Sequence, residues 1–153
     1  MDCLFETSTK YTMEEYKKFN FALIKKRHYI LVSIIAVVMI IASGILLHNY
    51  FLIFFGIIYP VLFYVAMQMG VKRVFNSNKL MQNMEVFYEF YEEYLVEKHD
   101  GGEAKVPYEK LSEVIETKTN FYLMIAKNQG FMLTKENMPE GLAEFIRSKT
   151  RSN

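Results

Sequence analysis

Histidine and cysteine, the side chains that most often bind transition metals, are few and far apart in this sequence. The three histidines, His28, His48 and His99, have no second histidine or cysteine at ligand spacing, so the sequence predicts no metal site. The one cysteine, Cys3, excludes an internal disulfide. His99 and Asp100 adjoin and could act as an acid–base pair, but the two glycines after Asp100 make a hairpin turn the simpler interpretation.

Loops that bind phosphate or present a catalytic serine are also missing from the sequence. The glycines never form the GxGxxG or GxxxxGK patterns that place backbone N–H groups around a phosphate, and there is no GxSxG motif. The sequence therefore predicts no catalytic residue, no cofactor and no enzymatic activity. The role of the protein should then come from its partners.

Charge is the strongest functional signal, because it is unevenly distributed along the second half of the chain. Between residues 85 and 116 there are ten acidic residues and three lysines, whereas residues 117–153 have six basic and three acidic residues. The acidic half could bind a basic protein, and we predict Glu89, Glu93 and Glu97 as its partner face. A plain solvated strand surface is the alternative. The net charge of +1 gives no reason to expect nucleic-acid binding.

Two long apolar runs are the elements that must position these residues. Hydrophobic residues make up 52% of the chain, and the excess lies between Tyr29 and Met69. Residues 29–47 carry no charge and as a helix would span about 28 Å, against a hydrocarbon core of about 30 Å. Residues 50–69 are also uncharged and contain Pro60, which should kink the helix. We expect a transmembrane hairpin over residues 29–70, with a soluble helix pair and a cleaved signal peptide as the alternatives.

Basic residues flank both apolar runs, and the turn between the runs has none. The positive-inside rule then places both termini in the cytoplasm, in a protein that crosses the cell membrane twice. We predict a set of basic residues at the membrane surface. This basic set comprises Lys17, Lys18, Lys25, Lys26, Arg27, Lys72 and Arg73.

Residues 1–28 form a charged N-terminal segment whose second half has the pattern of an amphipathic helix. Thr12 and Glu15 have the spacing of a capping box, and apolar residues then recur at helical intervals. This helix either lies on the membrane surface with its lysines toward anionic headgroups, or it simply leads into the first span. After the hairpin, residues 71–83 are predicted to be a polar linker.

Residues 84–153 have the pattern of antiparallel strands followed by one helix. Aromatic and β-branched residues alternate with glutamates, and a hairpin turn is indicated at residues 100–102. Further strands are predicted at residues 111–118, 121–126 and 131–134, and a closing helix after Asn137. The outline is a small, partly open barrel or sheet that we expect to fold on its own.

The sequence resembles the YcxB-like family of bacterial membrane proteins. A charged segment leading into a two-helix hairpin carries the resemblance, together with an ordered set of C-terminal residues. That set is Phe90, Val96, Pro107, Tyr108, Leu111, Val114, Glu116, Thr117, Phe121, Leu123, Phe131, Leu133, Lys135 and Met138. The resemblance implies a C-terminal domain similar to a bacterial pleckstrin-homology (PH) domain. It implies no catalytic or cofactor residues, and the acidic loop at residues 97–103 does not match the basic loop of PH domains that bind phosphoinositides.

Two functions follow as hypotheses. The first is a non-enzymatic, membrane-anchored scaffold or regulator whose cytoplasmic PH-like domain binds protein. The second is immunity against a membrane-active toxin or bacteriocin, by analogy with small membrane proteins that carry PH-like domains. The expected partners are the lipid bilayer and an unidentified protein, and self-association into a homo-oligomer stays open.

Overall fold

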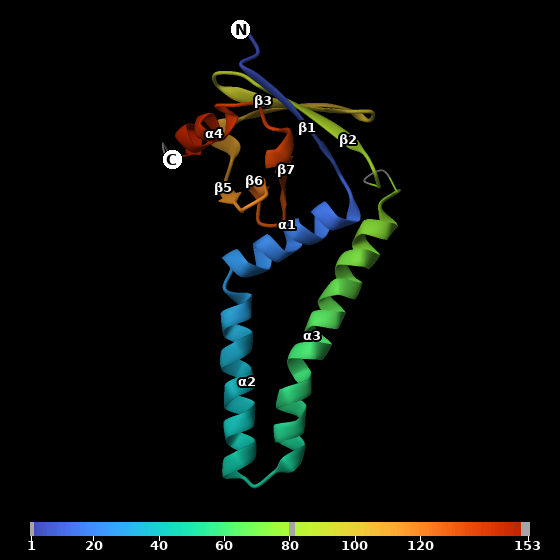
Figure 1. Ribbon diagram of the computed structural model, residues 1–153, viewed down its shortest axis with the longest axis vertical. Coiled ribbons are helices and arrows are strands. Elements are labelled where there is room, and N and C mark those ends of the chain that lie inside the picture. Colours follow the sequence, from blue (N-terminus) through green and yellow to red (C-terminus); the bar gives the residue numbers. More distant parts are fainter. Residues whose placement is uncertain (1, 80–81, 151–153) are drawn as a thin grey trace.

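The computed structural model describes residues 2–79 and 82–150, and it has an elongated part and a globular part (Figure 1). The elongated part is a hairpin of two helices, α2 (Tyr29–Leu46) and α3 (Tyr50–Ser77). The globular part, the β domain, contains two sheets. Helix α1 (Met13–Lys26) lies between the hairpin and the sheets (Figure 1).

The turn of the hairpin is built by polar residues and closed by glycine contacts. His48 adopts the left-handed conformation with φ 52°, and Asn49 Oδ1 accepts a hydrogen bond from the Phe51 N–H at 3.1 Å, which caps α3. A Cβ on Gly44 would lie 2.8 Å from Ile53 Cγ1, which is too close for any side chain. Glycine therefore allows the two backbones to approach near the turn.

The surface of the hairpin is apolar and exposed. In α2, which is described throughout, only Gly44 is buried, and in α3 only Gly56 and Phe75 are. Both helices are long and apolar enough to cross a membrane. A helix pair in the core of a soluble protein would be covered by the rest of the chain, and these two helices are not.

Helix α3 extends beyond the predicted span. The sequence predicts a polar linker at residues 71–83, but the helix continues to Ser77. The reason is tertiary, because Phe75 is buried against Tyr16 of α1 with ring centroids 5.6 Å apart. Residues 80 and 81 of the predicted linker lie outside the described residues.

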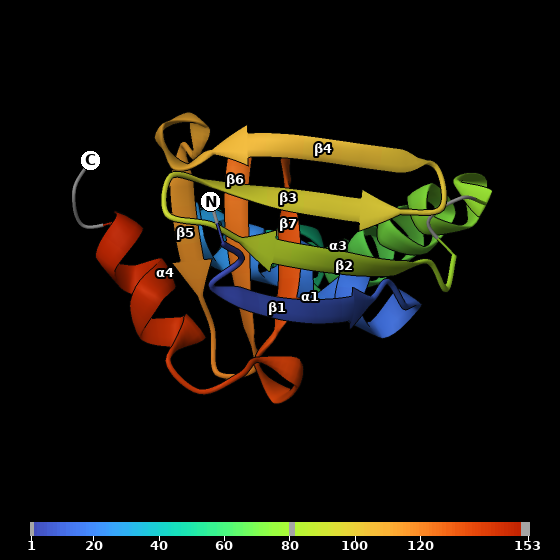
Figure 2. The same ribbon diagram turned by 90° about the horizontal axis from the view of Figure 1, so that it is seen from above.

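The first sheet has the order β1-β2-β3-β4 and lies on the side of the domain away from the hairpin (Figures 1 and 2). Its strands are antiparallel. They are β1 (Phe5–Lys10), β2 (Glu85–Phe90), β3 (Tyr94–His99) and β4 (Gly102–Pro107). The turn between β3 and β4 confirms the hairpin that the sequence predicts at residues 100–102.

The sequence analysis does not predict β1, although this strand is an integral part of the domain. It pairs along its whole length with β2, from Phe5 opposite Phe90 to Lys10 opposite Glu85. The Thr9 hydroxyl accepts a hydrogen bond from the Thr134 N–H at 3.1 Å, which links β1 to the second sheet. The helical hairpin is therefore inserted between two neighbouring strands of one sheet.

The second sheet has the order β5-β6-β7, and its strands run across those of the first sheet (Figure 2). They are β5 (Glu113–Glu116), β6 (Asn120–Ala126) and β7 (Gln129–Thr134), close to the predicted ranges. Within the described residues no strand ladder joins β4 to β5, so the strands form two packed sheets and not a closed barrel. Short 3₁₀ turns follow β4 (η2, Tyr108–Lys110) and β7 (η3, Lys135–Asn137).

The core lies between the two sheets and is closed by helices at its ends. Tyr88 and Phe90 are completely buried on the inner side of the first sheet, and Tyr122 is completely buried against Phe19 of α1. Helix α4 (Leu142–Thr150) confirms the predicted closing helix and buries Leu142. Together these features confirm the predicted fold of two long apolar helices, antiparallel sheets and a C-terminal helix.

Candidate functional site

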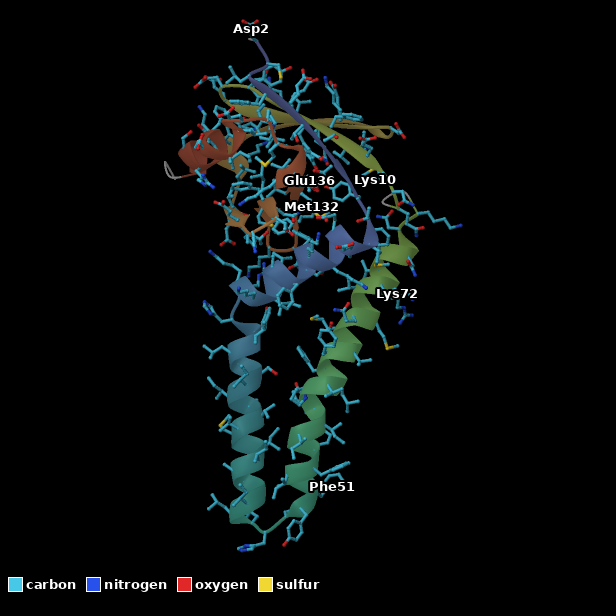
Figure 3. All side chains as sticks on the ribbon, viewed as in Figure 1. Asp2, Lys10, Phe51, Lys72, Met132 and Glu136 are labelled. Atoms are coloured by element: carbon cyan, nitrogen blue, oxygen red, sulfur yellow. The ribbon has the colours of Figure 1, made fainter. Side chains whose placement is uncertain are left out.

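The predicted basic set gathers at the junction where α1 lies between the hairpin and the β domain. Five of its members lie on α1 or directly after it, and the other two lie on α3. Figure 3 shows Lys72 near the level of α1 and Phe51 at the opposite end of the hairpin. The structure therefore brings the seven residues to one end of the apolar helices.

Two members of the basic set hold α1 against the second sheet. Lys26 Nζ lies 3.0 Å from a carboxylate oxygen of Glu113 on β5. The Arg27 guanidinium donates to Asn128 Oδ1 at 3.3 Å and to the carbonyl of Lys127, both in the turn between β6 and β7. These contacts orient the domain relative to the start of α2.

The N-terminal end of α1 is fixed by partly buried polar contacts. The Thr12 hydroxyl accepts a hydrogen bond from the Glu15 N–H at 3.2 Å, which is the predicted cap. The Glu15 carboxylate accepts from Lys18 at 2.8 Å and from the side-chain amide of the buried Asn120 at 2.6 Å. Because Asn120 opens β6, this contact ties the first turn of α1 to the second sheet.

The rest of the basic set points to solvent. Lys17, Lys25, Lys72 and Arg73 are exposed, and within the described part of the chain none of them makes an ion pair or hydrogen bond. An unpaired surface cation keeps its full charge available to an anionic surface. These four residues are therefore the members of the set that could face anionic lipid.

Helix α1 has two apolar faces, and sequence periodicity does not distinguish them. One face buries Phe19, Ala22 and Leu23 in the domain core, where Phe19 packs 5.2 Å from the ring of Tyr122. Phe21 lies on the other face and is 50% exposed. Helix α1 therefore does more than connect to α2, since one of its faces packs against the second sheet and covers the core of the β domain.

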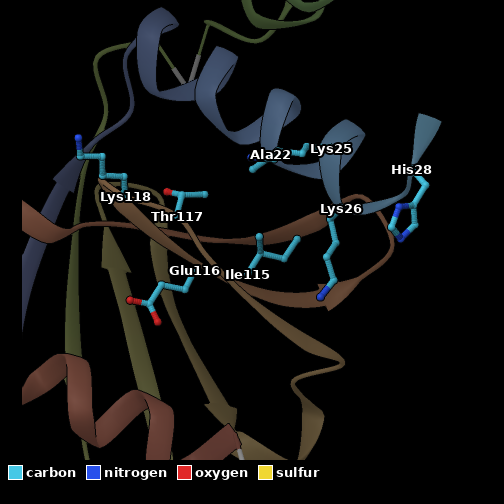
Figure 4. A pocket seen from close by; sticks show the side chains of 8 residues that line it. All are labelled: Ala22, Lys25, Lys26, His28, Ile115, Glu116, Thr117 and Lys118. Carbon is cyan, nitrogen blue, oxygen red and sulfur yellow. The ribbon is translucent and has the colours of Figure 1, made fainter. Parts of the chain in front are cut away.

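A hollow of about 620 Å³ lies between the end of α1 and β5 (Figure 4). Its basic side chains do not converge, because Lys118 and His28 lie at opposite ends of it (Figure 4). The lining residues are Ala22, Lys25, Lys26, His28, Ile115, Glu116, Thr117 and Lys118. This spread of charge suits an extended anionic layer better than one small ligand.

Glu116 is the acidic residue of this hollow, and two basic side chains of the protein already pair with its negative charge. Arg147 Nη2 lies 2.7 Å and Lys135 Nζ 2.6 Å from Glu116 Oε1. Their hydrogen bonds lower the pKa of Glu116 to about 2. The carboxylate is therefore ionised and paired at neutral pH, which does not suit a general acid or base.

A family model described as YcxB, YcxB-like protein, matches residues 90–149. This segment of the chain is similar to the YcxB-like family. The match confirms the family resemblance of the sequence. It begins at the last residue of β2 and ends in α4, so the hairpin, α1 and β1 lie outside it. Searches of curated proteins and of solved structures found no match.

The three glutamates of the predicted partner face do not form a single surface. Glu97 lies directly opposite the buried Tyr88, so it points to the inner side of the first sheet, and burial raises its pKa. Glu89 occupies the next position along β2 and points outward, while Glu93 is exposed in the β2–β3 turn. The three glutamates are close in sequence, but strand alternation separates them.

Glu89 is also engaged within the outer surface of the first sheet. It accepts hydrogen bonds from Lys98 and from the Tyr91 hydroxyl, the latter at 2.8 Å, and both lower the pKa of Glu89. Its charge is therefore compensated locally. Partner binding by these glutamates stays a prediction.

The most prominent apolar side chain on the outer surface of the first sheet is Phe87, which is 52% exposed. It borders a hollow of about 480 Å³. The lining residues are Glu6, Thr7, Ser8, Phe87, Tyr88, Glu89, Lys98 and Asn137. Because β1 forms one wall, sequence analysis without β1 could not predict this hollow, although an aromatic residue at an outward strand position was a detectable signal.

Proposed function

We propose that this YcxB-like protein is a non-enzymatic scaffold of the cell membrane. The hairpin spans the bilayer twice, and the β domain, similar to a PH domain, binds a protein on the cytoplasmic side. One observation carries this proposal. The exposed apolar hairpin is inserted between β1 and β2. The chain therefore connects the domain to the hairpin twice, through α1 into α2 and from α3 into β2.

The charge and aromatic distributions support the orientation. Lys17, Lys25, Lys72 and Arg73 are exposed at the end of the hairpin that adjoins the domain, whereas the turn carries no Lys or Arg. Tyr50 and the other aromatic residues near the turn suit the opposite headgroup region. The outer surface of the first sheet then points away from the membrane and into the cytoplasm (Figure 1).

A topology experiment tests the membrane part of this proposal. A reporter fused after Asn153 should report from the cytoplasm, and a reporter inserted at Asn49 should report from outside, because no Lys or Arg holds the turn inside. The fusion after Asn153 and the insertion at Asn49 serve as controls for each other. A reporter after Asn153 that responds only outside the cell would overturn the proposed orientation.

The binding part of the proposal places the partner on Phe87. Exposed aromatic rings beside a hollow are typical anchors of protein interfaces, and Phe87 lies on the surface farthest from the bilayer. A photoreactive residue at position 87 should capture a discrete protein in native membranes. The same residue at the exposed position 109, outside this hollow, is the control.

Affinity measured with the captured protein should fall about 30-fold in Phe87→Ala, since truncating an anchor residue typically costs 2 kcal/mol or more. Capture of the same proteins from positions 87 and 109 would contradict a docking site at Phe87. The immunity hypothesis rests on analogy, and no feature of the described residues favours it over the scaffold.

A further inference from the structure

An apolar cleft of about 240 Å³ lies between α1 and the two hairpin helices. α1 contributes two of its residues, and α2 and α3 form its walls. The lining residues are Phe21, Ile24, Ile30, Ser33, Ile34, Pro60, Phe63, Tyr64 and Met67. This cleft is separate from the hollow beside β5, because the two share no lining residue.

The cleft results from the uneven packing of the hairpin. Near the turn, Gly44 and Gly56 let the helices touch, since a Cβ on Gly56 would lie 2.7 Å from Ile41 Cγ1. Toward the domain the walls carry large side chains, and α2 and α3 diverge to meet opposite ends of α1 (Figure 1). The space between them opens on the side of the domain, where the inner leaflet of a bilayer would lie.

The lining of the cleft suits an apolar occupant and not water. Water needs two to four polar partners, and only Ser33 and Tyr64 among the lining residues offer a side-chain hydroxyl. An alkyl chain suits this space.

Two exposed lysines on α1, the helix that closes the cleft, indicate the headgroup of that chain. Lys17 lies four residues before Phe21 and so shares one face of α1 with it, and Lys25, which also borders the hollow beside β5, directly follows Ile24 of the cleft lining. Both lysines are exposed and unpaired within the described residues. A cation beside an apolar cleft favours an anionic lipid over a zwitterionic one.

We propose that the cleft holds one acyl chain of an anionic phospholipid of the inner leaflet, with the lipid phosphate beside Lys17 and Lys25. The proposal rests on the proposed function, because it requires the hairpin to lie in a bilayer. It adds a specific lipid site to a scaffold that would otherwise only be surrounded by lipid.

The sequence contains no tryptophan, so one introduced tryptophan reports on one position. We compare Phe63→Trp, in the cleft wall, with Phe54→Trp, which is on the same helix, 62% exposed and outside the cleft. Each full-length protein is placed in vesicles of phosphatidylcholine and phosphatidylglycerol. Bromine, which quenches tryptophan, is carried on the acyl chains of one lipid or the other.

In Phe63→Trp, quenching should show that brominated phosphatidylglycerol occupies the cleft about fivefold more often than brominated phosphatidylcholine at equal mole fraction. The Phe54→Trp protein should be quenched equally by both. Met67→Trp, from the same wall, repeats the measurement should Phe63→Trp fail to fold. Equal quenching by the two lipids at the cleft position, or no quenching there, would overturn the lipid site.

A charge control separates the site from general attraction to the membrane. In the Phe63→Trp protein, Lys17→Gln with Lys25→Gln should remove the preference for phosphatidylglycerol. Lys72→Gln with Arg73→Gln should retain that preference. The controls are also exposed, but Lys72 lies about two and a half turns after Phe63 and so on the opposite side of α3. Equal loss in both variants would overturn the site. If Phe54→Trp escaped quenching by both lipids, the hairpin would lie outside the bilayer, and the proposed function would fail as well.

Discussion

Residues 84–153 expressed alone are expected to show no cooperative unfolding transition, which reverses the expectation from the sequence that this segment folds by itself. The fragment lacks β1, whose backbone pairs with β2, and it lacks α1, which covers Tyr122. Completely buried side chains such as Tyr88 would then lose part of their cover. A domain this small has little stability to spare.

A chain that keeps β1 and α1 but omits the hairpin is the matched comparison. Residues 3–27 are joined to residues 78–153 by a flexible linker. The 14-residue helix α1 is about 21 Å long, a distance that a Gly/Ser linker of about 14 residues spans on average. This linked domain should stay soluble and unfold cooperatively.

Circular dichroism during urea titration and the dispersion of amide chemical shifts distinguish the two proteins. A sharp transition and dispersed amide resonances are expected only for the linked domain. Cooperative unfolding of residues 84–153 alone would show that β1 and α1 are dispensable. Failure of the linked domain to fold would show that the domain needs the hairpin.

In the linked domain, Phe19→Ala should lower the free energy of unfolding by about 3–5 kcal/mol, and Phe21→Ala should change it by about 0.5 kcal/mol or less. The two residues are of the same type and lie on the same helix. Phe19 is 7% exposed and contacts Tyr122, whereas Phe21 is 50% exposed and faces the cleft. The difference therefore measures which face of α1 belongs to the domain.

The free energy is measured by urea titration of the three linked domains with a common slope. Similar losses for both substitutions would show that Phe21 also packs on the domain, and would contradict the assignment of its face to the hairpin. In the full-length chain Phe21 has a second role, because it contributes to the apolar cleft.

Several features could be predicted from the sequence because they depend on local interactions. A run of apolar residues determines a long apolar helix wherever it lies, and the predicted starts at Tyr29 and Tyr50 match the structure. The cap at Thr12 and the turn at Gly101 and Gly102 depend on neighbouring residues only. The family match also lies in a continuous segment, residues 90–149.

Strand β1 shows why other features could not be predicted. Two of its three inward positions are Thr7 and Thr9, and only Phe5 is apolar, so it lacks the alternation of apolar residues that identifies a strand. These hydroxyls are satisfied by partners far along the chain, the Asn137 carbonyl and the Thr134 N–H. Only the tertiary structure brings those groups within reach, and only then does a polar segment become a buried strand.

The functional residues divide in the same way. The order of residues along the chain placed the basic residues beside the apolar helices, because they directly flank the apolar runs. Which lysines are free and which are paired was decided by the fold, since Glu113 approaches Lys26 but no acidic residue in the described chain approaches Lys25. Glu89 and Glu97 were separated by the pleat of the sheet. The cleft arises only where three helices meet, because its walls come from segments more than twenty residues apart.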